Sequence, residues 1–143
     1  MLIYTFYYEY NYRMKNYRTD IIQYAKRKYK TRPEHLWARH PNYVVLRRDD
    51  NAKWYGIIMD VPRVRLGLGG DESVDILNVK CDAGMYDFLR GVPGILRGYH
   101  MGGTWVSVLL DGTIEISQIK ILLDNSYNLV CGKKSVGYDL KNS

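Results

Sequence analysis

The residues of this chain best suited to catalysis are two cysteines and three histidines, and their spacing matches no catalytic or metal-binding motif. His35, His40 and His100 lack the His-x-x-x-His spacing of a helical zinc site, and no Cys-x-x-Cys motif is present. Cys81 and His100 could form a thiolate–imidazole pair, but Cys81 lies in an apolar, strand-like run and no third residue is evident to orient the base. We therefore expect a structural Cys81, no enzymatic activity, no metal and no cofactor.

The glycine-rich run Gly67-Leu68-Gly69-Gly70 also lacks the context of a nucleotide site. A dinucleotide loop leads from a strand into a helix, whose N-terminus faces the pyrophosphate. Here the flanking segments both have strand character, so we interpret the run as a turn between strands.

Charge and aromatic content indicate a polyanionic partner. The chain carries a formal charge of +6, which favours DNA, RNA or an acidic surface but also occurs in proteins that bind none of them. The aromatic residues Trp54, Tyr55, Tyr99 and Trp105 could stack on unpaired bases, with core packing as the alternative. The basic residues that we expect to contact nucleic acid are Arg48, Lys53, Arg63, Arg65, Lys80, Arg97 and His100.

Length and composition predict one domain. With 143 residues and 46% hydrophobic residues, the chain can bury one core of useful size. Cys81 and Cys131 are too few for a disulfide framework, so reduced thiols are expected. No apolar run approaches the roughly 20 residues that span a bilayer. We expect a cytoplasmic protein without a membrane segment.

Periodicity predicts helices near both ends of the chain. A first helix should begin at a Thr19 or Asp20 cap and stop before Pro33, with basic residues in its last turns. A short middle helix over 83–90 should be capped by Asp82. A closing helix should run from about Ile119 to Val130, with Gly132 as its C-cap.

Between the helices the pattern predicts strands. The run Ile57-Ile58-Met59 indicates a strand buried on both faces. Residues 63–68 alternate, which predicts a half-buried strand with Arg63 and Arg65 on its wet face. The predicted strands cover residues 43–48, 53–61, 63–68, 73–81 and 104–110, with 95–100 extended.

The first thirteen residues differ from the rest because five of them are tyrosines. Either the protein starts at Met14, or residues 1–13 form an extension that adds a strand or contacts a partner. We predict a single domain over residues 14–134 and a frayed tail over 135–143.

Several short sequence motifs, in their order along the chain, resemble those of the MmcQ/YjbR family of small bacterial proteins. They are the segments 53–61, 75–82 and 98–101, followed by Trp105 and 109–112. The resemblance implies an α+β fold related to secretion chaperones, in which an antiparallel sheet is flanked by N-terminal, middle and C-terminal helices. It also implies a DNA-binding role, which is the usual label of family members. The family-motif residues expected to be structural are Trp54, Tyr55, Asp60, Cys81, Asp82, Tyr99 and Trp105.

The chain departs from the family pattern after His100. Many members read His, Leu or Met, Asn, Lys, any residue, His and Trp, whereas residues 100–105 read His-Met-Gly-Gly-Thr-Trp. The run is one residue shorter and lacks the Asn, the Lys and the second His. The resemblance therefore carries over only His100 and Trp105 in this phrase.

These observations leave two hypotheses. The first is a non-enzymatic DNA-binding protein that contacts phosphates through a basic face, which gives affinity with little sequence information. The alternative is a protein-interaction module without a nucleic-acid role, in one version a homodimer, as the chaperone-like fold suggests by analogy.

Overall fold

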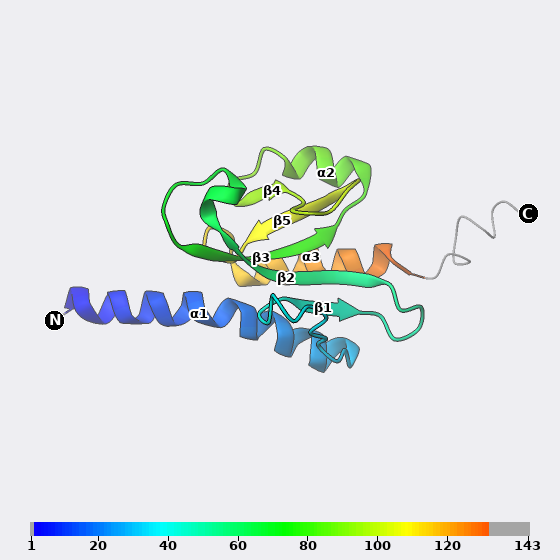
Figure 1. The fold of residues 1–143 in the computed structure, drawn as a ribbon, viewed down its shortest axis with the longest axis horizontal. Helices are drawn as coiled ribbons and strands as arrows, with labels where there is room; N and C mark the ends of the chain where they lie inside the picture. The colour runs from blue at the N-terminus through cyan, green and yellow to red at the C-terminus, as the bar shows by residue number, and fades with distance from the viewer. Residues whose placement is uncertain (1, 132–143) are drawn as a thin grey trace, which may run out of the picture.

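The computed structural model describes residues 2–131, apart from the side chains of residues 6–16. In this range the chain forms three α-helices, one 3₁₀ helix (η1) and five strands (Figure 1). Their order is α1 (Leu2–Tyr29), β1 (Val44–Arg47), β2 (Trp54–Pro62), η1 (Arg63–Leu66), β3 (Ser73–Lys80), α2 (Ala83–Leu89), β4 (Ile95–Arg97), β5 (Trp105–Leu109) and α3 (Ile116–Leu129).

The strands form one antiparallel sheet with the spatial order β1-β2-β3-β5-β4. The sheet and its helices confirm the predicted α+β fold with helices at the start, middle and end. Strand β2 has a neighbour on each side, and Ile57, Ile58 and Met59 are all buried, as the apolar run predicted. Strands β1 and β4 are the two edges of the sheet.

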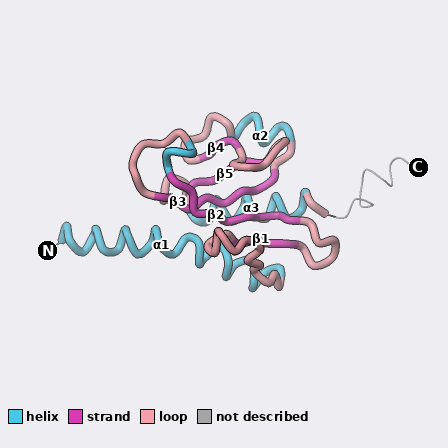
Figure 2. Tube along the Cα trace, viewed as in Figure 1, coloured by secondary structure: helices cyan, strands magenta, loops and turns pink. Residues whose placement is uncertain are grey.

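The two faces of the sheet are covered differently. All three α-helices pack on one face, where α3 crosses behind β2 and β3 (Figure 1). We call this the helix-side core; its helical members include Ile21, Ala25, Leu89, Ile119 and Leu123. Loops cover the other face (Figure 2), and we call the cluster there the loop-side core. Its partly buried members include Trp37, Trp54, Leu66, Leu68, Tyr99, Met101 and Trp105.

Gly56 lets α3 lie close to the sheet. A Cβ atom at this position would lie 3.0 Å from Cδ1 of Leu123 and 3.2 Å from Cδ1 of Leu46. In real structures such contacts force the neighbouring side chains to move. The residue lies next to a β-bulge, because Leu46 pairs with Gly56 while Arg47 pairs with Trp54. The bulge turns Tyr55 into the helix-side core, where it is fully buried.

Helix α1 begins much earlier than predicted. It runs without a break from Leu2, so residues 2–13 are helical, and the expectations of an added strand and of a cap at Thr19 or Asp20 were wrong. The predicted domain boundary at Met14 falls inside this helix. The helix ends where Lys30 adopts a positive φ of 59°, and the Thr31 N–H bonds the Ala25 carbonyl. The Lys30 N–H also bonds the Lys26 carbonyl at 3.1 Å, which is the bond of an αL C-cap, so the helix stops before Pro33.

Residues 63–68 do not form the predicted strand. Pro62 ends β2, and Arg63–Leu66 form the 3₁₀ helix η1, which stops at Gly67 with a left-handed φ of 74°. Leu66 and Leu68 pack in the loop-side core, but Val64 is 72% exposed. The alternation was misleading because a 3₁₀ helix repeats every three residues, so residues two apart in sequence need not share a face.

The other helices follow the predictions closely. The Asp82 carboxylate accepts a hydrogen bond from the Met85 N–H at 2.8 Å, which confirms the predicted cap of α2. Helix α3 covers the predicted segment and begins slightly earlier, at Ile116. The predicted C-cap Gly132 and the tail 135–143 lie outside the described residues.

Candidate nucleic-acid interface

Strand register gathers most of the predicted basic residues at one end of the sheet. Arg47 pairs with Trp54, Lys80 pairs with Trp105, and Arg97 pairs with Val106, so five strand ends coincide there. We call this the Lys80 end; it lies on the right in Figure 1. The predicted contacts found at this end are Arg48, Lys53, Lys80, Arg97 and His100.

Arg63 and Arg65 lie at the opposite end of the sheet. They belong to η1, which follows the far end of the nine-residue strand β2. At about 3.3 Å per residue, this strand separates Lys53 from Arg63 by roughly 30 Å. Arg63 is also engaged locally, because its Nε donates a hydrogen bond to the Gly69 carbonyl and holds the loop. Arg65 is exposed. The predicted basic set is therefore divided between two distant places.

The basic residues differ in whether a carboxylate already neutralises them. Arg48 forms an ion pair of 2.7 Å with Asp50, donates to the Tyr127 carbonyl and lies over the Tyr127 ring. These contacts give Arg48 a structural role between β1 and α3. In contrast, Lys53, Lys80 and Arg97 are exposed and have no ion pair with any described residue. Their charge is available to an external anion.

Lys80 lies beside two half-buried tryptophans. Val79 belongs to the helix-side core, so alternation directs Lys80 to the loop side, where Trp105 is its direct partner and Trp54 lies on the neighbouring strand β2. Trp54 packs edge-on against Trp37, with 5.9 Å between ring centroids, and lies beside the guanidinium of Arg47. Both tryptophans thus contribute to the loop-side core while keeping part of their surface exposed. Tyr55 is core only.

A buried polar network fixes the loop that carries His100. Ser107 Oγ donates to Asn78 Oδ1 and accepts from the Tyr99 N–H at 2.8 Å, while Asn78 Nδ2 donates to the Tyr99 carbonyl at 3.1 Å. Buried polar groups that are fully paired hold a single conformation. The network therefore positions Tyr99 and the exposed His100, which has a positive φ of 59°.

The Lys80 main chain is tied to α3 by one hydroxyl. Ser126, which is fully buried on α3, accepts from the Lys80 N–H at 2.9 Å and donates to the Tyr55 carbonyl at 2.7 Å. The carbonyl belongs to the β-bulge, where the strand ladder is interrupted. Ser126 thus satisfies two main-chain groups of the sheet that would otherwise be buried without partners.

The remaining family-motif residues occupy structural positions. Asp60 on β2 accepts a hydrogen bond from Asn42 Nδ2 at 3.0 Å. Cys81 is a free, buried thiol in the helix-side core, and burial, with a smaller contribution from Asp82, raises its pKa to about 11. A buried thiol with a raised pKa is a poor nucleophile. His100 lies exposed in the β4–β5 loop, away from that core.

Neither a metal-binding cluster nor a membrane-spanning helix is found among the described residues. Residues 2–131 contain no group of three or more His, Cys, Asp or Glu side chains that could hold a metal ion. Among the described helices, none combines the length and apolar character required to cross a membrane.

Sequence reasoning missed two residues next to Arg97. Tyr86 on α2 and Arg90, the C-cap residue of that helix, line a pocket together with Arg97 of β4. The contact between α2 and β4 is tertiary, so the sequence alone offers no signal for it. The spacing of Tyr86 and Arg90, four residues apart on one helix, shows only that these two share a face.

The fold and its basic sheet end define a small α+β domain with a single antiparallel sheet backed by helices. Residues 26–129 match the model of the YjbR family, and the chain belongs to the MmcQ/YjbR family. It is 43% identical over 113 residues to YyaQ of Bacillus subtilis strain 168, a protein described as uncharacterized; the match covers 78% of this chain and 96% of YyaQ.

Solved structures show the same fold. A crystal structure of a Pseudomonas syringae protein aligns with a TM-score of 0.75 at 40% identity, covering 78% of this chain and 97% of that one. A crystal structure of a Deinococcus radiodurans protein aligns with a TM-score of 0.56 at 22% identity, covering 78% of this chain and 76% of that one. The second likeness concerns the fold alone.

Proposed function

We propose that this protein binds DNA without catalysing a reaction, and that the Lys80 end of the sheet is the contact surface. The observation that carries the proposal is the convergence of Lys53, Lys80 and Arg97 on one sheet end without ion-pair partners among the described residues. Unpaired cations on neighbouring elements release counterions when they meet a phosphate backbone, which drives binding of any sequence. A cytoplasmic location accompanies this proposal.

The tryptophans beside Lys80 add a preference for unpaired bases. Trp105 pairs with Lys80 and Trp54 pairs with Arg47 at the same sheet end, and aromatic rings beside cations are the combination that proteins use to hold single strands. Each stacked base contributes about 1–3 kcal/mol in such sites. Single-stranded DNA is therefore expected to bind more tightly than duplex DNA of the same length.

Fluorescence anisotropy of labelled single-stranded and duplex 20-mers, repeated over a salt series, tests the proposal. Lys53→Glu/Lys80→Glu should weaken binding at least tenfold and lower the salt slope by about 0.7–0.9 per lost contact. Arg63→Glu/Arg65→Glu changes the net charge equally but alters the distant end, so it should weaken binding far less. Because Arg63 holds its loop, the exposed single variants Lys80→Glu and Arg65→Glu provide the cleanest comparison.

Each outcome has a definite meaning. Equal losses in the two double variants would show that net charge alone controls binding and would reject the Lys80 end as the surface. No binding by the native protein even at low salt would reject the DNA-binding function itself.

A protein-interaction role is the second candidate, and the start of α1 favours it. Leu2 and Ile3 are 78% and 85% exposed on a helix that projects beyond the strand ends of the sheet (Figure 1). Exposed apolar side chains on a projecting helix are a common feature of docking surfaces. Light scattering coupled to size exclusion tests the homodimer version: a dimer that Leu2→Lys/Ile3→Lys converts to a monomer would support it, and a monomeric native protein would exclude it.

A further inference from the structure

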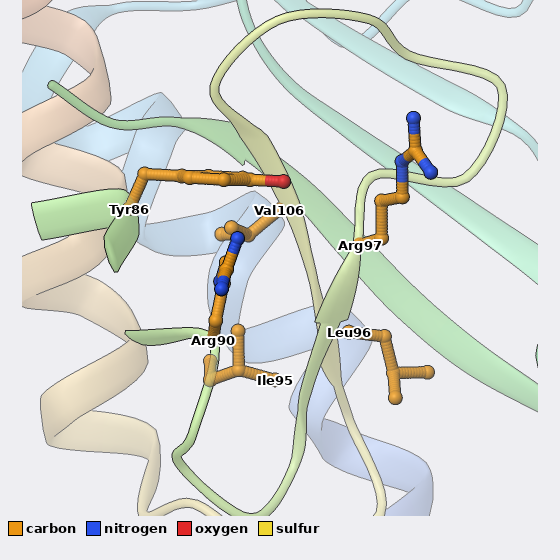
Figure 3. Close-up of a pocket in the computed structure, with 6 residues that line it drawn as sticks. All are labelled: Tyr86, Arg90, Ile95, Leu96, Arg97 and Val106. Carbon is orange, nitrogen blue, oxygen red and sulfur yellow. The ribbon is translucent and has the colours of Figure 1, made fainter. Parts of the chain in front are cut away.

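A pocket of about 470 Å³ opens between α2 and the β4 edge of the sheet (Figure 3). It is lined by Tyr86, Arg90, Ile95, Leu96, Arg97 and Val106. Its size is within the usual range of small-molecule sites. The lining combines aliphatic side chains and one aromatic ring with two guanidinium groups, so it suits a ligand that is apolar at one end and anionic at the other.

Both arginines of the pocket are free to bind an anion. Arg90 and Arg97 are exposed, and neither forms an ion pair with a described residue. Arg90 instead lies beside the Tyr86 ring (Figure 3). Its Cζ is 6.0 Å from the ring centroid. In Figure 3 the Arg97 guanidinium points away from Arg90, so the exposed Arg97 side chain must turn toward the pocket for one ligand to contact both arginines. Each guanidinium presents a planar fork of donors that matches phosphate oxygens.

The free edge of β4 adds a main-chain donor near the same place. The Gly98 N–H bonds the Trp105 carbonyl at 3.1 Å, so the alternation of an antiparallel ladder directs the Arg97 N–H away from β5. No further strand pairs with β4 among the described residues. The site thus offers a peptide N–H in addition to the two side chains, as in many anion-binding sites at sheet edges.

We propose that this pocket binds a small phosphate monoester, with the phosphate held by Arg90 and Arg97 and the organic group lying against Tyr86, Ile95 and Val106. The charge decides the class of ligand. A phosphate monoester carries nearly two negative charges above pH 7 because its second pKa is about 6, so it can neutralise both arginines. A carboxylate or a sulfate ester carries one charge and leaves the second arginine uncompensated.

The inference is independent of DNA binding. Arg97 belongs to both surfaces, but Tyr86 on α2 and the C-cap residue Arg90 are not part of the Lys80 end. Arg90→Gln should therefore weaken ligand binding while leaving anisotropy titrations with DNA unchanged. Lys53→Glu should have the converse effect.

Isothermal titration calorimetry in phosphate-free buffer at pH 7.5 tests the pocket with two probes of similar shape. Phenyl phosphate is a dianion under these conditions, and phenyl sulfate is a monoanion. Phenyl phosphate should bind at least tenfold more tightly than phenyl sulfate. Arg90→Gln and Arg97→Gln should each weaken phenyl phosphate binding about tenfold or more, as expected for charge-assisted hydrogen bonds. Arg90→Lys, which keeps the charge but loses the fork, should give an intermediate loss.

Arg39→Gln is the matched control, because Arg39 is exposed, lies outside the pocket and has no ion pair with a described residue. It should bind phenyl phosphate like the native protein. Circular dichroism and thermal melting of each variant show whether it is folded, which is expected since all three arginines are exposed. Three outcomes would overturn the proposal. The native protein could fail to bind phenyl phosphate at roughly 10 mM, which marks the weak end of useful affinities. It could bind the two probes with equal affinity, or Arg39→Gln could lose as much affinity as the pocket variants.

Discussion

The hydroxyl of Tyr29 on α1 donates a hydrogen bond of 2.5 Å to Oδ1 of Asp124 on α3, across 95 residues of sequence. Tyr24 donates to Oδ2 of the same carboxylate at 2.6 Å, and Lys28 Nζ lies 3.0 Å from it. A single aspartate therefore joins the first and last helices of the domain. Burial alone would raise the pKa of Asp124, but the hydrogen bonds from Tyr24, Tyr29 and Lys28 outweigh it and hold the pKa below 3.8.

Replacing Asp124 with Asn should destabilise the protein by about 1–3 kcal/mol at pH 7, because a half-buried acceptor of three hydrogen bonds is lost. The loss should depend on pH. The folded state lowers the pKa of Asp124, so the stabilisation is complete above the unfolded value of 3.8 and disappears as the pH falls through the lower folded value. Urea denaturation from pH 7 to pH 3 measures both effects.

Asp71→Asn is the control, since Asp71 is exposed in the loop before β3. Its difference from the native protein should be small at every pH. If the Asp124→Asn difference stayed constant down to pH 3, the carboxylate would not be the stabilising species.

Gly98→Ala should destabilise the protein by about 1–3 kcal/mol, because a Cβ atom there would lie 2.7 Å from the Trp105 carbonyl oxygen. The contact is with main chain, so it is relieved only if β4 and β5 move apart and lose the Gly98–Trp105 hydrogen bond. Gly91→Ala is a matched variant with nothing within 4 Å of its Cβ, and it should be neutral or slightly stabilising. The melting temperature should therefore fall in Gly98→Ala but not in Gly91→Ala, and equal shifts would contradict the close approach.

Cys81 should resist alkylation in the folded protein. With a pKa of about 11, roughly one Cys81 in a thousand is ionised at pH 8, and the side chain is also buried. Iodoacetamide at pH 8 should therefore modify the less buried Cys131 first and reach Cys81 only in urea. Peptide mass spectrometry measures the alkylation rates of the two cysteines. Rapid modification of Cys81 in buffer would contradict its structural role and support a catalytic one.

Much of the fold could be predicted because local pattern and tertiary environment agree. The buried run Ile57-Ile58-Met59, the Asp82 cap and the apolar face of α3 each have the environment that their sequence indicates. The wrong predictions concern segments where the local sequence pattern and the observed structure disagree. The Arg63–Leu68 alternation is formally that of a strand, but Pro62 and Gly67 confine it to a short 3₁₀ turn. The tyrosine-rich start has no clear helical period, yet it continues α1.

The candidate site could be predicted by residue type but not by place. Charge and family resemblance singled out Arg63 and Arg65 together with Lys80, whereas strand register puts them at opposite ends of the sheet. Register depends on long-range pairing that no local window contains. Arg90 was missed for the same reason, because it lines the same pocket as Arg97 only through the packing of α2 beside β4.

The two hydrogen bonds of Ser126 make the last turns of α3 part of the sheet's own cooperative unit. If that helix end frayed, the Lys80 N–H and the Tyr55 carbonyl would both lose their partner, so opening the helix also opens β2 and β3 at this point. In native-state hydrogen exchange, the Lys80 amide should exchange at the rate of the α3 amides rather than that of an ordinary strand end. Lys80, which we propose contacts DNA, would then have a main chain as rigid as α3.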